Sequence, residues 1–441
     1  MLVLKETGYK QYLVVILAII LAFNYTDGWV LGLLLQNIKV DLSLSDTQLG
    51  FLSGIAFALF YSVLGVPIAR WADRGNRVTI ISITTALWSV MVALCGFAGN
   101  FVQLLLVRVG VAVGEAGCVP PAHSLLSDYF PREERPRAIA RYMMIGGPLS
   151  LVIGYFLGGW LNEFVGWRAT FILLGLPGIV MATLARLTLR EPRHRSSKPQ
   201  GMTPKGTIAA DLASTVTPES AHQSLIAVCT TLWANKTFRH LLVCVSISYF
   251  FAAGINQWQP TFLVRSYGLK TGEIGTWFAV IYGVGSFLGT YWGGEWASRY
   301  AAQNERLQLK VMAAVYCSFV LISPLIYLTS NKFVAFAIMG IANLAVSTTN
   351  GPLFAMIQTL VPGHMRATAL ALVYLFANLV GVGFGPLAAG ALSDALQTYW
   401  HAQSLRYALL ALCPGYFFAA WHLWRARLTV VPDVQASLAT S

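Results

Sequence analysis

The sequence contains few charged residues. Asp, Glu, Lys and Arg make up 11% of its 441 residues, and 56% are hydrophobic. A typical soluble domain is about 25% charged. A soluble protein of this size could not bury so much apolar surface, because even large domains keep a polar exterior. The composition therefore excludes intrinsic disorder and a nucleic-acid-binding surface, and it predicts a chain whose solvent is mostly lipid.

Several chemical signatures are also missing. The six cysteines form no CxxC pair and five lie in apolar runs, so we expect neither a disulfide nor a metal site. No GxxxxGK[ST], HExxH or GxSxG motif is present. We therefore expect no ATP hydrolysis, no enzymatic activity and no bound cofactor.

Long apolar runs fill most of the chain and predict an all-α membrane protein with twelve spans. A charged connection at 190–237 divides the spans six and six, and Leu225, Val228 and Leu232 predict a short surface helix at its end. The expected domains are six-helix bundles at 1–189 and 238–428, the linker at 190–237 and a tail at 429–441. The predicted spans are 11–36, 46–69, 78–98, 101–126, 137–162, 167–188, 239–264, 273–297, 309–330, 333–359, 367–392 and 404–425.

The basic residues give the orientation. With the N-terminus inside, inner segments hold 23 of the 30 Lys and Arg residues and outer loops hold six. Cytoplasmic loops of membrane proteins are enriched in Lys and Arg. We therefore place both termini in the cytoplasm and interpret the net charge of +12 as an orientation signal.

The two halves repeat each other. Gly50 corresponds to Gly275, and Asp73-Arg74 to Ser298-Arg299, both at an offset of 225 residues. Pro131 and Pro362 correspond at an offset of 231. Repeats of this kind place a binding site near the membrane midplane and imply alternating access.

The connection between the second and third predicted spans carries a recognisable motif. Residues 69–77 read Ala-Arg-Trp-Ala-Asp-Arg-Gly-Asn-Arg, which resembles the loop signature of the major facilitator superfamily. Asp73 can pair with Arg74 or Arg77 in one state and release them in another, although a solvated, charge-anchored loop would look the same. The second-half copy has Ser298 in place of the aspartate, so we expect weaker gating there. The gating candidates are Asp73, Arg74, Arg77, Arg137 and Arg299.

Three ionisable residues lie inside predicted spans, where charge is costly and indicates function. Arg108 and Glu115 are seven residues apart and share a helix face, and Asp27 lies at a similar depth. Burial favours the neutral form of a carboxyl group, whereas a nearby arginine favours the charged form. Two carboxyl groups beside one arginine favour a proton carrier over a structural salt bridge.

Asn24-Tyr25-Thr26-Asp27, the loop motif and Arg108 to Ala116 together resemble the Spinster branch of the superfamily, including its bacterial members. The resemblance implies the major facilitator fold and secondary transport of lysophospholipids, sphingosine phosphates or similar amphiphiles, in some members linked to protons. It also implies that Asp27 and Glu115 are protonation sites and that Arg108 is their partner. The family usually has Arg after the first-span aspartate, whereas this chain has Gly28.

Polar and aromatic residues in other spans suit a ligand with a polar head and an apolar body. A lone Asn or Tyr in a span is also a common packing or interface residue. The candidate substrate-binding residues are Asn24, Tyr25, Phe57, Tyr61, Tyr142, Tyr249, Asn256, Gln257, Trp258, Asn343, Thr348, Asn350, Tyr374 and Asn378.

We interpret the chain as a secondary transporter of the bacterial cytoplasmic membrane that acts as a monomer. The expected partners are membrane lipids, a small amphiphile of the lysolipid class and the proton as coupling ion. A drug or organic-anion carrier is the alternative within transport. A non-transporting membrane sensor is a second alternative, and an intramembrane enzyme is disfavoured because no nucleophile and base pair is visible.

Overall fold

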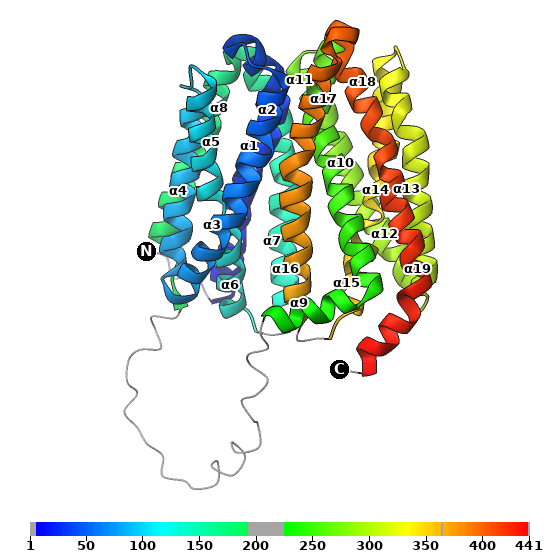
Figure 1. The fold of residues 1–441 in the computed structure, drawn as a ribbon. Coiled ribbons are helices and arrows are strands. Elements are labelled where there is room, and N and C mark those ends of the chain that lie inside the picture. Colours follow the sequence, from blue (N-terminus) through cyan, green and yellow to red (C-terminus); the bar gives the residue numbers. More distant parts are fainter. Residues whose placement is uncertain (1–5, 132, 193–224, 363–364, 440–441) are drawn as a thin grey trace.

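The computed structural model describes residues 6–131, 133–192, 225–362 and 365–439. The described residues form helices connected by short turns, with no strand among them. This part of the chain confirms the predicted all-α class. The long helices lie side by side along a common axis through the molecule (Figure 1).

We call residues 6–192 the first half and residues 225–439 the second half. The first half comprises α1 (Glu6–Leu42), α2 (Asp46–Ser53), α3 (Ile55–Arg74), α4 (Arg77–Cys95), α5 (Phe101–Glu115), α6 (Val119–Tyr129), α7 (Arg135–Leu151), η1 (Val152–Leu157) and α8 (Gly158–Thr188). The second half comprises α9 (Leu225–Ala234), α10 (Lys236–Tyr267), α11 (Thr271–Phe278), η4 (Ala279–Val284), α12 (Gly285–Tyr300), α13 (Glu305–Leu328), α14 (Lys332–Ser347), α15 (Asn350–Thr359), α16 (Arg366–Phe376), η6 (Ala377–Gly383), α17 (Phe384–Trp400), η7 (His401–Gln403), α18 (Ser404–Leu412), η8 (Cys413–Gly415) and α19 (Tyr416–Ala439).

Local sequence explains where these helices begin and turn. Ser45 accepts a hydrogen bond from the backbone N–H of Gln48, and the Gln48 side chain accepts one from the backbone N–H of Ser45, which is a capping box. Asn76 and Asn100 cap α4 and α5 in a similar way. Gly166 has a φ of 79°, a left-handed conformation that suits glycine, and the chain turns there between two spans.

Nine helices in the described residues are long and apolar enough to cross a membrane. Two of them, Arg137–Thr188 with 52 residues and Thr368–Ala436 with 69, are each long enough to cross twice, because one crossing needs about 20 residues. The predicted span 273–297 is not among the nine. The count of twelve spans is compatible with these lengths and stays a prediction, as does the exact domain division.

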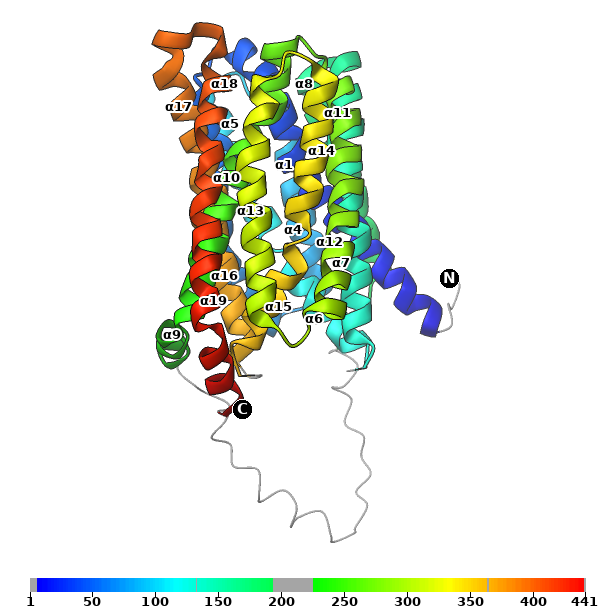
Figure 2. The ribbon, with the colours of Figure 1, turned by 90° about the vertical axis from the view of Figure 1, so that its right-hand side faces the viewer.

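One end of the bundle carries α9, a described part of the predicted linker (Figure 1). We call it the loop end and the opposite end the distal end. Most of the predicted linker lies outside the described residues, but α9 forms at its predicted place and lies across the loop end (Figure 1). The C-terminal turns of α19 lie at the same end (Figure 2). Because α19 continues to Ala439, the start of the predicted tail at 429–441 is an extension of the last helix.

Candidate functional site

The interior of the first half contains an ion pair. Asp27 of α1 and Arg108 of α5 are paired, and each side chain is 2% exposed. The guanidinium group of Arg108 also lies over the ring of Phe57 of α3, 5.5 Å from its centroid. The structure therefore brings together two of the three charges predicted to act together and adds an aromatic wall.

Glu115 completes this group on the last turn of α5. The residue is 5% exposed, and its Oε1 atom has no hydrogen-bond partner in the described part of the chain. The Oδ1 atom of Asp27 is equally unpartnered there. A buried polar atom without a partner is costly, so a partner such as a proton or a ligand group would be stabilising at this place.

Aromatic and amide side chains of the first half surround these charges. Phe57 stacks on Tyr61 with ring centroids 5.6 Å apart. Tyr25 is 36% exposed, whereas Tyr142 is buried against His123. Asn24 is buried, and neither atom of its amide has a partner among the described residues. These positions combine unfilled hydrogen-bonding capacity with aromatic surface.

Several second-half candidates have structural contacts. Trp258 is completely buried, and its Nε1 donates to the carbonyl oxygen of Pro386 at 2.9 Å, so it holds α10 against α17. Asn343 donates to the carbonyl oxygen of Ile281 at 2.9 Å, and Thr348 donates to that of Ala345 at 2.7 Å. These contacts occupy donors that were predicted to face a ligand.

Other second-half candidates remain available. Tyr374 is 43% exposed and stacks on Phe354. Gln257 lies against Gly32 of α1, and the hydroxyl of Tyr282 donates to Asn256 at 3.4 Å. Tyr249 and Asn378 are half-buried and Asn350 is exposed.

The gating candidates have different surroundings. Arg77 is completely buried and pairs with Glu191 at 2.5 Å and Asp128 at 2.6 Å, so it ties together the ends of α4, α6 and α8. Arg74 is exposed, and the Asp73 side chain lies outside the described residues. Exposed Arg299 pairs with Glu295 one turn away, and Arg137 is exposed at the loop end.

The sequence did not reveal a polar network that joins the two halves at the distal end. Asp46, at the start of α2, accepts two hydrogen bonds from Arg265 of α10, at 2.7 and 2.8 Å. Lys39 and Ser393 also donate to Asp46, at 2.5 and 2.7 Å. The available signals were the acidic first turn of α2 and the presence of Arg265 in outer loops that are otherwise poor in cations.

Two helix starts at the distal end are capped by the opposite half. The carboxylate of Asp394 in α17 accepts from the backbone N–H groups of Asp46 and Thr47 at 3.1 and 2.7 Å. The carboxylate of Glu163 in α8 accepts from the backbone N–H of Gly272 at 2.9 Å. A carboxylate stabilises a helix N-terminus by satisfying free N–H groups and the helix dipole. The two caps repeat each other across the internal pseudo-symmetry.

The repeated glycines lie at the same two junctions. A Cβ atom at Gly50 would collide with the carbonyl oxygen of Pro386, and one at Gly275 would collide with that of Tyr155. The helices therefore approach so closely that a larger residue does not fit. The correspondence between Gly50 and Gly275 thus marks a pair of matching contacts between the halves.

Comparisons with known proteins agree with this architecture. The sequence profile described as Major Facilitator Superfamily matches residues 17–386. An MFS-type efflux pump of Mycolicibacterium smegmatis is 31% identical over 401 residues, covering 90% of this chain and 87% of the relative. Protein spinster homolog 1 of Xenopus tropicalis is 26% identical over 443 residues, covering 93% of this chain and 80% of the relative.

A solved structure is also similar throughout. It is a bacterial homolog of the human lysosomal transporter Spinster in an inward-facing and unoccupied conformation, 29% identical with a TM-score of 0.82. The match covers 96% of this chain and 98% of that structure. The predicted resemblance to Spinster-like proteins is therefore confirmed.

Proposed function

This chain belongs to the major facilitator superfamily and is an integral membrane transporter rather than an enzyme, and from this premise we propose that it moves a lipid-like amphiphile in exchange or symport with protons. In this proposal it works as a monomer in the bacterial cytoplasmic membrane, and the proton is its coupling ion. No bound cofactor takes part.

The observation that carries the proposal is the charge balance around Arg108. Asp27 and Glu115 are both buried near this one cation, and each keeps one oxygen atom without a hydrogen-bond partner among the described residues. If both carboxyl groups were ionised, a net negative charge would remain in a medium of low dielectric, which is expensive. One proton shared by the two groups restores neutrality, and its loss changes what Arg108 binds.

An amphiphilic substrate suits the side chains around these charges. Exposed Tyr25 and Tyr374 provide apolar surface with a polar hydroxyl, and the unpartnered amide of Asn24 provides a donor and an acceptor. A Cβ atom at Gly28 would meet nothing within 4 Å, so there is open space where Spinster relatives usually carry an arginine. We propose that this space lets the chain accept head groups without a phosphate.

The contacts between the halves suit one state of a transport cycle. With the loop end in the cytoplasm, as the basic residues predict, the Asp46–Arg265 network and the two helix caps close the outer side. This arrangement supports an inward-facing state, like the similar Spinster homolog. In the outward-open state, we propose that Asp73, Arg74, Arg137 and Arg299 take part in closing the loop end, with Arg77 as a buried anchor.

Drug export is the second candidate. The 31% identical relative is described as an MFS-type efflux pump, and the aromatic side chains around Arg108 would also suit a drug. The two candidates differ in ligand chemistry rather than in mechanism, so a ligand panel separates them.

The test is transport by the purified protein in proteoliposomes with a pH gradient. The panel contains a lysophospholipid, a cationic dye and a sugar acid. We expect the lysophospholipid to be transported, and Tyr25→Ala with Tyr374→Ala to reduce that transport, whereas Phe417→Ala on α19, which removes a more exposed aromatic ring, has no effect. Transport of the dye without the lysophospholipid would support efflux, and transport of the sugar acid alone would overturn the amphiphile proposal.

A further inference from the structure

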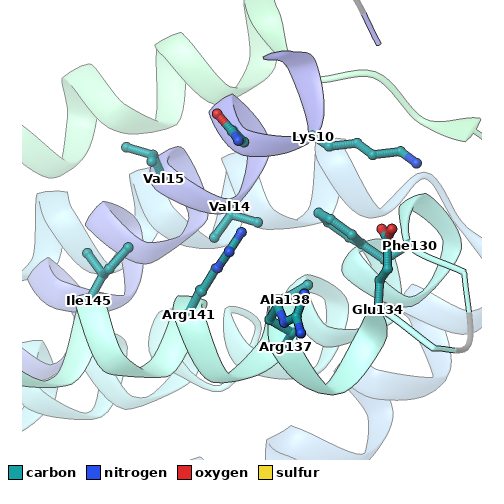
Figure 3. Close-up of a pocket in the computed structure, with 10 residues that line it drawn as sticks. Lys10, Val14, Val15, Phe130, Glu134, Arg137, Ala138, Arg141 and Ile145 are labelled. Carbon is teal, nitrogen blue, oxygen red and sulfur yellow. The ribbon is translucent and has the colours of Figure 1, made fainter. Parts of the chain in front are cut away.

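A pocket of about 380 Å³ lies between the first turns of α1 and the start of α7. Figure 3 shows Arg141 extending from α7 toward Val14 of α1, and Phe130 and Glu134 at the end nearer Lys10. Figure 2 shows the first turns of α1 projecting from the bundle beside α7. The pocket is thus on the flank of the first half, toward the loop end.

The polar side of this pocket carries excess positive charge. Lys10, Arg137 and Arg141 line it together with a single acid, Glu134. Arg137 and Arg141 are exposed and one turn apart on α7, and neither makes a hydrogen bond or ion pair in the described part of the chain. Like charges at this spacing repel each other. An anionic ligand between them would remove that repulsion.

The other side of the pocket is apolar. Val15 and Ile145 are 43% and 39% exposed on helices long and apolar enough to cross a membrane. Their side chains are therefore partly open at the surface rather than packed in a core. A free phosphate ion would use the cations and leave this surface unused, whereas a phospholipid would use both.

The pocket is distinct from the interior charges. Lys10 and Asp27 are seventeen residues apart on α1, which is about 25 Å along a helix. A ligand head group bound at Lys10 would therefore not contact the pair formed by Asp27 and Arg108.

We propose that this pocket binds an anionic phospholipid of the leaflet at the loop end. The phosphodiester group lies between Arg137, Arg141 and Lys10, and an acyl chain lies along Val15 and Ile145. Basic pockets between membrane helices on the cytoplasmic side bind such head groups. The site does not involve the transport substrate, and although Arg137 is also a gating candidate, lipid retention is measured without transport, so its test is separate from that of the proposed function.

The test is native mass spectrometry of the full-length protein with phosphatidylglycerol and phosphatidylcholine of identical acyl chains. We expect preferential retention of phosphatidylglycerol. Arg137→Gln with Arg141→Gln lowers that preference by on the order of tenfold, because each basic residue near the membrane surface contributes to binding anionic lipid. Glu134→Gln has the opposite effect and strengthens retention.

Arg306→Gln with Lys310→Gln is the matched control. These cations are exposed and one turn apart on α13, but they do not line the pocket. We expect this variant to retain phosphatidylglycerol like the unaltered protein. Equal loss in both double variants, unchanged retention in the Arg137 and Arg141 variant, or displacement of the lipid by millimolar inorganic phosphate would overturn the proposal.

Discussion

Two buried arginines of this transporter do different work. Arg108 pairs with Asp27 inside the first half, where Glu115 supplies a second carboxyl group. Arg77 lies at the end of α4 and is held by two carboxylates, Asp128 and Glu191. The first arrangement keeps one oxygen of each carboxyl group without a hydrogen-bond partner among the described residues and suits exchange of a proton, whereas the second holds three helix ends in place.

This difference predicts how Arg77 contributes to stability. Arg77→Gln removes a completely buried cation together with its ion pair to Glu191, whose side chain is 3% exposed, so we expect destabilisation by roughly 3 kcal/mol. Arg299→Gln is the control in the second half, where the arginine is 68% exposed and its loss should cost at most about 1 kcal/mol. Thermal unfolding in detergent measures both. Equal shifts in melting temperature would show that Arg77 is not an anchor.

The sequence predicted the residues of the interior site better than those of the distal network. Asp27, Arg108 and Glu115 stand out because charge is rare within apolar runs. Asp46 and Arg265 do not stand out, because each lies at the end of a predicted span and their pairing joins residues 219 positions apart. Trp258 was expected to bind substrate, but burial and its bond to Pro386 give it a packing role that sequence alone could not distinguish.

At the scale of helices, the glycines of the internal repeat explain how the halves meet. Gly50 brings α2 against α17, and Gly275 brings α11 against η1 and α8. Hydrophobic patterns predicted the helices and their approximate ends. They could not predict these contacts, because the same glycine would serve equally well for bending or for packing within one half.

A larger residue at Gly275 should therefore favour separation of the halves at the distal end. We expect Gly275→Ala to lengthen the distance between spin labels at Val40 and Tyr399, which are exposed on α1 and α17. Gly340→Ala is the control, because a Cβ atom there meets nothing within 4 Å. Electron paramagnetic resonance on protein with its native cysteines replaced measures the distance. An unchanged distance for Gly275→Ala would mean that the close approach does not control distal closure.

At the scale of the whole molecule, a closed distal end is combined with an interior site that holds two carboxyl groups. In a major facilitator protein, substrate and proton reach such a site alternately from the two sides. A ligand or proton shifts the balance of states only through a difference in binding between them. The hydrogen bonds at Asp46, Gly272 and Thr47 are contacts of one state, which must break when the distal end opens.

The central claim is that Asp27 and Glu115 couple transport to protons, and uptake by proteoliposomes under a pH gradient tests it most directly. Asp27→Asn with Glu115→Gln removes both groups that can bind and release the proton. We expect this variant to lose stimulation by the gradient while it still exchanges substrate across the membrane, which shows that it is folded. Gradient-driven uptake equal to that of the unaltered protein would contradict the account.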